Sequence, residues 1–116
     1  MLAHRHRFHG HGSLRYLFKN GEASRSRFMT VKYIANPRRK HSRFAVVISK
    51  KVHKSAVGRN RMRRRVYEVI RLNVHRMARP SDVAVIVTSG EVLGMEAEVL
   101  RQQIEGQFRE AGLYNQ

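Results

Sequence analysis

The sequence predicts a single α/β domain, built as a two-layer α+β sandwich of one sheet and its helices. The chain has 116 residues, which suits one compact domain. Unbroken apolar runs at 44–48 and 83–88 indicate strands that are covered on both faces. A long basic amphipathic pattern lies between them, so the three segments form a βαβ unit whose strands are expected to be parallel. The predicted order is α-β-β-(β)-α-β-α, with the crossover through the basic helix.

Charge is distributed unevenly along the chain. The formal net charge is +16, and such an excess predicts a polyanionic partner, of which nucleic acid is the commonest. Residues 1–67 hold 19 Lys and Arg against one acid, whereas residues 68–116 hold five against seven acids. We therefore expect the partner to meet the first two-thirds of the chain and the last third to be mostly scaffold.

Composition also excludes several classes of protein. The absence of cysteine excludes disulfides and thiolate metal sites, and it fits a reducing compartment. No apolar run approaches the ~20 residues that a membrane span needs, and the basic N-terminus lacks the apolar centre of a signal peptide. A cytoplasmic location without a membrane partner is expected.

Residues 1–12, MLAHRHRFHGHG, show neither helical nor strand periodicity. They predict a flexible, basic, histidine-rich arm that becomes ordered on RNA, followed by a single RNA-binding domain over 13–116. A metal-binding tract is the disfavoured alternative, because no acid or cysteine is at hand to complete a site. No metal site is expected in the protein.

Residues 13–20, SLRYLFKN, predict a short amphipathic helix with Ser13 as its N-cap. Leu14, Leu17 and Phe18 share one face. Tyr16 lies off that face beside cations, as in platforms on which nucleic-acid bases stack. Phe18 fits equally well as a base-stacking residue and as a packing residue against a sheet.

Two strands are expected next, at 26–35 and 43–49. The first alternates, so that Met29, Val31 and Tyr33 should face one side of the sheet. We expect the two strands to form a hairpin, with 43–49 as a central strand. A short extra strand is possible between 38 and 43.

The long helix is expected from 56 to 77, with Ser55 as its N-cap. Gly58 is unfavourable inside a helix and indicates a close backbone approach or a later helix start. The expected buried stripe comprises Met62, Val66, Val69 and Ile70. The expected outward face comprises Asn60, Arg61, Arg64 and Arg71, with Glu68 able to pair with Arg64 and Arg71.

A last helix is expected over 95–111, with Leu100, Ile104 and Phe108 on its buried stripe and with acids that suit a cover for the sheet. The hypothesis of an enzyme finds little support. No Gly-rich phosphate loop, Ser/His/Asp elbow or HExxH motif is present. His53, beside Lys51 and Lys54, is a loop residue more readily than a general acid-base group.

Two motifs together resemble the protein subunit of bacterial ribonuclease P. The first is Ser49-Lys50-Lys51, a short connection, and then the basic run 59–65, Arg-Asn-Arg-Met-Arg-Arg-Arg. The second is 14–21, which is similar to the family's Phe-x-x-Val-Phe-x-x-Gly helix, with Leu14 where the family usually has Phe. The order of elements also matches from Arg7 to Leu113.

The resemblance implies a fold like the second domain of a small-subunit ribosomal protein, with a left-handed crossover through the basic helix. It implies that catalysis resides in a large RNA with bound Mg²⁺, and that the protein contributes no catalytic residue and needs no obligate protein partner. The partner RNA would contact a first group of residues, namely Lys54, Arg59, Asn60, Arg61, Arg63, Arg64, Arg65 and Arg71. The 5′ leader of precursor tRNA would lie between the first helix and the sheet, against Tyr16, Phe18, Tyr33, Ser49, Lys50 and Lys51. The alternatives are a ribosomal or ribosome-associated RNA-binding protein of the same fold and a self-sufficient nuclease.

Overall fold

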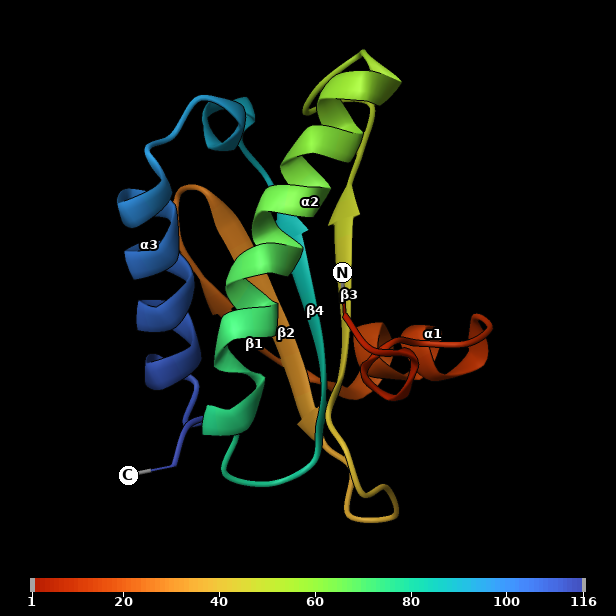
Figure 1. Cartoon of the computed structure of the whole chain (residues 1–116). Helices are drawn as coiled ribbons and strands as arrows, with labels where there is room; N and C mark the ends of the chain where they lie inside the picture. Colours follow the sequence, from red (N-terminus) through yellow and green to blue (C-terminus); the bar gives the residue numbers. More distant parts are fainter. Residues whose placement is uncertain (1, 116) are drawn as a thin grey trace.

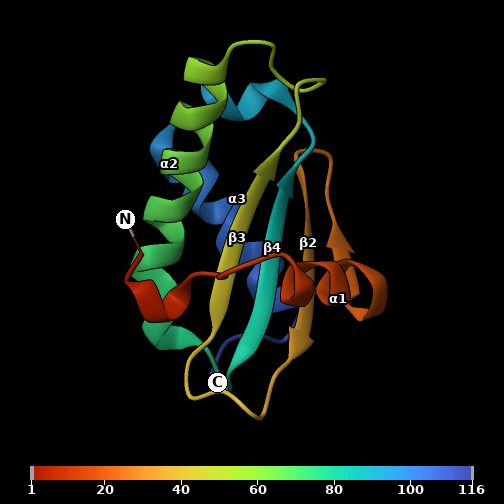
Figure 2. The same ribbon diagram turned by 90° about the vertical axis from the view of Figure 1, so that its right-hand side faces the viewer.

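A four-stranded sheet with helices on both faces forms the molecule (Figure 1). The structure is a computed structural model that describes residues 2–115. The main helices are α1 (Gly12–Asn20), α2 (Ala56–Asn73) and α3 (Ala97–Glu110), and the strands are β1 (Glu22–Arg25), β2 (Met29–Ala35), β3 (Arg43–Ile48) and β4 (Ser81–Val87). Three 3₁₀ turns complete it, η1 (His4–His6), η2 (Val74–Arg76) and η3 (Gly90–Leu93). Helices α2 and α3 lie on one face of the sheet and α1 on the other (Figures 1 and 2).

The strand order β1-β2-β4-β3 confirms one expectation and corrects two. β3 and β4 are parallel, as the βαβ pattern predicts. The expected hairpin between 26–35 and 43–49 is wrong, because β2 pairs with β1 and β4. β4 is a central strand, whereas β3 lies at the edge, where Arg7 of the N-terminal segment forms a bridge to Phe44. The apolar run of β3 therefore reflects cover by other segments and not a central position.

The crossover from β3 to β4 is left-handed. In Figure 1, α2 lies in front of the sheet, both strands point upward, and the chain passes from β3 on the right to β4 on its left. Chain-direction rules favour the opposite hand. The family resemblance implied this hand, and nothing in the local sequence pattern indicates it.

β1 is the strand that the sequence pattern misses, and no separate strand forms between 38 and 43. Its sequence, EASR, is short and polar and carries no periodicity. A residue of α3 holds β1 in place: the Gln107 side-chain amide donates to the Ser24 carbonyl at 3.0 Å and to the Met29 carbonyl at 3.2 Å. A contact between residues so far apart in sequence leaves no local signal.

The core lies between the sheet and the pair α2 and α3. The expected α2 stripe is confirmed, since Met62, Val66 and Ile70 are fully buried and Val69 is 7% exposed. Phe44 of β3 stacks on Phe108 of α3 with ring centroids 6.4 Å apart. This packing holds α2 by one face and leaves its opposite face outward.

The ends of the helices partly follow the expected caps. Ser55 caps α2, because its hydroxyl accepts from the Gly58 amide at 3.3 Å. The expected close approach at Gly58 is confirmed, since a Cβ there would lie 2.2 Å from Cε1 of the His53 ring. The expected cap at Ser13 is wrong: α1 begins one residue earlier, with His11 at the cap position and no side-chain cap.

The N-terminal segment is packed on the domain, which differs from the flexible arm expected over 1–12. Leu2 is 5% exposed, and the His6 ring bonds through Nδ1 to the Ser42 carbonyl at 2.8 Å. The Phe8 ring stacks on the guanidinium of Arg43, 4.6 Å from its centroid. From there the segment crosses the α1 side of the sheet (Figure 2). No helix in the described part of the chain is long and apolar enough to cross a membrane.

Candidate nucleic-acid interface

The outward face of α2 carries two arginines without a partner in the described part of the chain, beside Asn60, whose side-chain oxygen accepts from the Arg63 guanidinium at 2.6 Å. Asn60, Arg61 and Arg64 are exposed, as the helical spacing predicts. Within residues 2–115, the Arg61 and Arg64 guanidinium groups form neither a hydrogen bond nor an ion pair. Free guanidinium groups on one helix face suit the phosphates of a nucleic acid, which they can bind through two parallel hydrogen bonds.

Two other arginines of the basic run are bound to the protein's own backbone. The Arg59 guanidinium donates to the carbonyls of His53 and Lys54, each at 2.8 Å. Arg65 donates to the carbonyl of Val92 at 2.7 Å, to that of Leu93 at the end of η3, and to that of Met95 just after it. These two residues hold the loops beside α2, and they have fewer donors left for RNA than Arg61 and Arg64.

Glu68 sits on the outward face of α2 and pairs with one arginine of the two expected. Its carboxylate accepts from the Arg71 guanidinium at 2.6 Å, and the hydrogen bond lowers the pKa of Glu68. The same bond raises the pKa of Arg71. Arg64 therefore keeps its charge uncompensated, while Arg71 is shared between Glu68 and any anionic partner.

The end of β3 brings three more candidates close to the start of α2. Ser49, Lys50 and Lys51 are exposed and form a turn, in which the Ser49 carbonyl accepts from the amide of Val52 at 3.1 Å. Lys54 is also exposed, four residues before Gly58. The cations of this turn and those of the first turns of α2 thus lie at the same end of the molecule.

Helix α1 lies on the other face of the sheet, where it is tied to β2. The Lys32 ammonium donates to the Phe18 carbonyl at 2.8 Å. Phe18 is half-buried, whereas Tyr16 is 59% exposed. Tyr16 borders a hollow of about 470 Å³ that is also lined by Pro37 and Arg38 of the β2–β3 loop. That loop lies at the opposite end of β3 from Ser49.

Tyr33 does not lie with Phe18, which corrects the expected leader cleft. Tyr33 pairs with Val83 and packs against the core on the α3 side of the sheet. Burial and then the charges of Glu22 and Glu110 raise the pKa of its hydroxyl. The strand alternation already separates Tyr33 from Lys32, whose side chain reaches α1.

The sequence did not single out a row of half-buried side chains on the face of the sheet that carries α1. Thr30, Ile86 and Val47 are direct neighbours across β2, β4 and β3. All three are half-buried, and Val47 stands two residues before Ser49. The alternation of β2 could have singled out Thr30, but the apolar runs of β3 and β4 conceal which of their side chains face α1.

The fold and this surface define a small basic α/β protein with a helix suited to a phosphate-rich polymer. The chain matches the ribonuclease P family over residues 2–112 and belongs to that family. Its function is therefore that of a ribonuclease P protein component, in tRNA processing, and the ribosomal alternative is not favoured.

Individual relatives agree with this assignment. The chain is 34% identical over 95 residues to the ribonuclease P protein component of Thermus aquaticus, covering 82% of this chain and 54% of the relative. It is 27% identical over 97 residues to that of Synechocystis, covering 84% and 77%. The chain thus spans about half the length of the Thermus relative. The Staphylococcus aureus RNase P protein shares the fold, with a TM-score of 0.83 over 95% of this chain and 98% of that one, at 22% identity.

Proposed function

We propose that the chain binds the catalytic RNA of ribonuclease P through α2 and assists removal of the 5′ leader of precursor tRNA. The observation that carries this proposal is the outward face of α2, where Arg61 and Arg64 are exposed and without partners among residues 2–115. Positive charges at this density repel one another in an isolated helix, so the phosphates of an RNA are their natural counterions.

The chemistry in this proposal belongs to the RNA and to the Mg²⁺ that the RNA binds. The protein contributes cations near the substrate, which raises the affinity for precursor tRNA and favours metal occupancy at the cleavage site. No protein side chain acts as nucleophile or general base.

The 5′ leader is proposed to lie on the α1 side of the sheet, between α1 and the turn after β3. Phe18 and the row Thr30, Ile86 and Val47 offer a half-buried, mostly apolar surface on which bases can lie. Stacking of a base on an aromatic ring such as that of Phe18 tolerates any sequence. Ser49 and the two lysines that follow it supply polar and cationic groups at the end of that row. Tyr33 has no place in this surface, because it faces α3.

Cleavage of precursor tRNA tests the proposal. The protein is added to precursor tRNA with and without the ribonuclease P RNA of the same organism, at low Mg²⁺. We expect cleavage only with the RNA present, and faster cleavage when the protein is added. Cleavage by the protein alone, or no effect of the protein on the RNA, would contradict the proposal.

Phe18→Ala separates leader binding from packing. If Phe18 contacts the leader, the variant binds precursor tRNA more weakly while its affinity for mature tRNA is unchanged. Stacking of one base on an aromatic side chain is worth about 1–3 kcal/mol. A lower thermal midpoint with unchanged selectivity would show that Phe18 only packs α1 on the sheet.

A further inference from the structure

A basic hollow lies at the end of the molecule opposite to the β3 turn. Its volume is about 580 Å³, within the range of small-molecule sites. Three segments that are far apart in sequence form its walls: the N-terminal segment, the β2–β3 loop, and the stretch from the end of α2 to Pro80. Figure 2 shows the N-terminal segment beside the C-terminal half of α2.

The walls of the hollow are rich in basic side chains. Four arginines and lysines and three histidines line the hollow, and no acid from the described part of the chain does so. The basic lining residues are Arg5, His6, Lys40, His41, Arg71, His75 and Arg79. A solvated surface normally mixes both signs of charge, so this concentration indicates an anionic ligand.

Contacts within the protein hold the walls in place, so the segments that carry the cations are brought together without a ligand. The His6 ring bonds to the Ser42 carbonyl at 2.8 Å, and it meets the His41 ring edge-on with centroids 5.4 Å apart. The Ser42 hydroxyl accepts from the Ser81 amide at 3.0 Å, which ties the β2–β3 loop to the start of β4. The N-terminal segment is thus docked on the loop that forms the facing wall.

The charges of the hollow act on one another. Partial desolvation and then the positive charges of Arg5, His6, Lys40 and Arg39 lower the pKa of His41. Protonation of His41 is therefore opposed by the cations already present. A bound phosphate would relieve that repulsion.

The hollow is continuous with the basic face of α2. Arg71 belongs to both, because it lies on the outward side of the helix and also lines the hollow. Its partner Glu68 is the one acid on that face of the helix. A chain of phosphates running along α2 from Arg61 would reach the hollow at the helix's far end.

We infer that this hollow binds backbone phosphate of the partner RNA and anchors the protein at the C-terminal end of α2. The inference rests on the proposed function for its choice of RNA. It adds a second RNA-binding site that is separate from the turn after β3 and from the first turns of α2. The protein then binds the RNA at both ends of α2.

A phosphate titration tests the hollow without any RNA. The ring signals of His41 and His75 are followed by NMR while inorganic phosphate replaces chloride at constant ionic strength and pH. His11 is the internal reference, because it is exposed and does not line the hollow. We expect a saturable shift of His41 and His75 and no shift of His11. Equal shifts at all three rings, or none, would overturn the inference and leave the proposed function intact.

The second test measures RNA binding and uses a triple variant, Arg5→Ala, Lys40→Ala and Arg79→Ala. All three side chains are exposed and make no hydrogen bond to residues 2–115, so each change should leave stability within about 0.5 kcal/mol. The control removes the same number of cations elsewhere: Arg25→Ala, Arg27→Ala and Arg109→Ala. Binding of the ribonuclease P RNA is measured from low to high salt.

We expect the slope of log K against log[salt] to become shallower in the hollow variant, by roughly 0.7–0.9 for each phosphate that is no longer neutralised, and to stay unchanged in the control. Equal slopes for the hollow variant and the control would overturn the inference. If Arg61→Ala and Arg64→Ala still flatten the slope in that case, the proposed function stands. Failure of the wild-type protein to bind the RNA would overturn both.

Discussion

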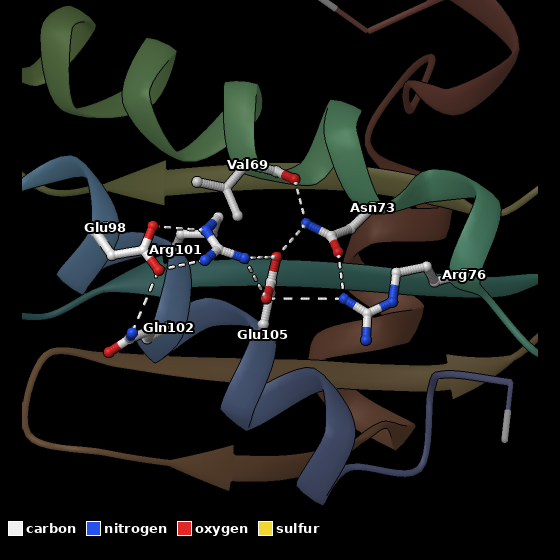
Figure 3. Close-up of polar contacts among 7 residues, drawn as sticks. All are labelled: Val69, Asn73, Arg76, Glu98, Arg101, Gln102 and Glu105. Atoms are coloured by element: carbon white, nitrogen blue, oxygen red, sulfur yellow. Dashed lines mark hydrogen bonds and ion pairs between the residues drawn. The ribbon is translucent and has the colours of Figure 1, made fainter.

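Arginines serve opposite purposes on two sides of α2. On the outward side, Arg61 and Arg64 are exposed and without partners among residues 2–115. On the side facing α3, arginines are neutralised within the protein. Glu105 of α3, 13% exposed, accepts from Asn73 at 3.0 Å and from Arg101 at 3.1 Å, and its carboxylate lies 3.7 Å from Arg76 (Figure 3).

The difference between these two sides follows from where the acids lie. Six of the eight acids lie in β4 and the segments after it, and two of them, Glu98 and Glu105, pair with arginines of α3 and of η2. Glu68 is the one acid available to the outward face of α2. Arginines that no acid of the protein neutralises remain available to an anionic partner. Stability measurements and RNA-binding measurements should therefore separate the two sets of arginines.

The largest effect on stability is expected at Arg43. Its guanidinium donates to the Asp82 carboxylate at 2.7 Å, and both side chains are 6% exposed. Arg43→Ala leaves the Asp82 charge buried and should lower the free energy of unfolding by about 3–5 kcal/mol, measured by urea denaturation. The double variant Arg43→Met with Asp82→Leu should recover much of that stability. A decrease below about 1 kcal/mol in the single variant would mean that water reaches Asp82.

A smaller decrease in stability is expected at Arg65. Arg65→Ala leaves the carbonyls at the end of η3 without their donor, which should cost about 1–3 kcal/mol. Because its donors are occupied within the protein, the salt slope for RNA should stay close to that of the wild type. Arg63→Ala, two positions earlier and partly exposed, is the control for stability. A slope that flattens as much as for Arg61→Ala would assign Arg65 to the RNA-binding face.

Tyr114 should affect stability only in alkaline solution. Its hydroxyl is buried without a partner among residues 2–115, and burial raises the pKa of Tyr114 to about 12. Because the unfolded side chain ionises near its ordinary value of 10.0, the wild type should lose stability as pH rises from there towards the folded pKa. Tyr114→Phe should remove this part of the pH dependence and change little at neutral pH. Identical alkaline unfolding curves for the two proteins would show that the hydroxyl is hydrated.

The smallest effect on stability is expected for Arg61→Ala with Arg64→Ala, within about 0.5 kcal/mol for each change. Their effect on RNA binding should be large, with a salt slope shallower by roughly 0.7–0.9 for each phosphate that the removed guanidinium groups neutralise. Replacing them with Lys should keep most of the slope. A marked decrease in stability, or an unchanged slope, would show that the two sides of α2 are not divided as described.

Some features of the site could be predicted from local sequence alone. The helical spacing separates the buried stripe at Met62 and Val66 from the outward pair Arg61 and Arg64, because both sets belong to one continuous element. The Ser55 cap and the close approach at Gly58 depend on residues only a few positions away. Parallel pairing of β3 with β4 follows from the length of the connection between them.

Other features depend on contacts that no local pattern records. The sequence does not show that β3 lies at the edge, that Arg65 binds the carbonyls of η3, or that Tyr33 faces away from Phe18. Each of these depends on a segment far away along the chain, or on which strands become neighbours. Pairing of distant strands is decided by the energy of the whole core and not by any one stretch.

By itself, the sequence of this ribonuclease P protein determined the sign of the charge, the strand-helix-strand order around α2, and which face of α2 points outward. These follow from composition and from the period of one helix. Only the tertiary structure decided which cations stay free, because that depends on where acids and carbonyl groups arrive from other segments. It also decided that the N-terminal segment, the β2–β3 loop and the end of α2 meet in one basic hollow, since no spacing along the chain relates them.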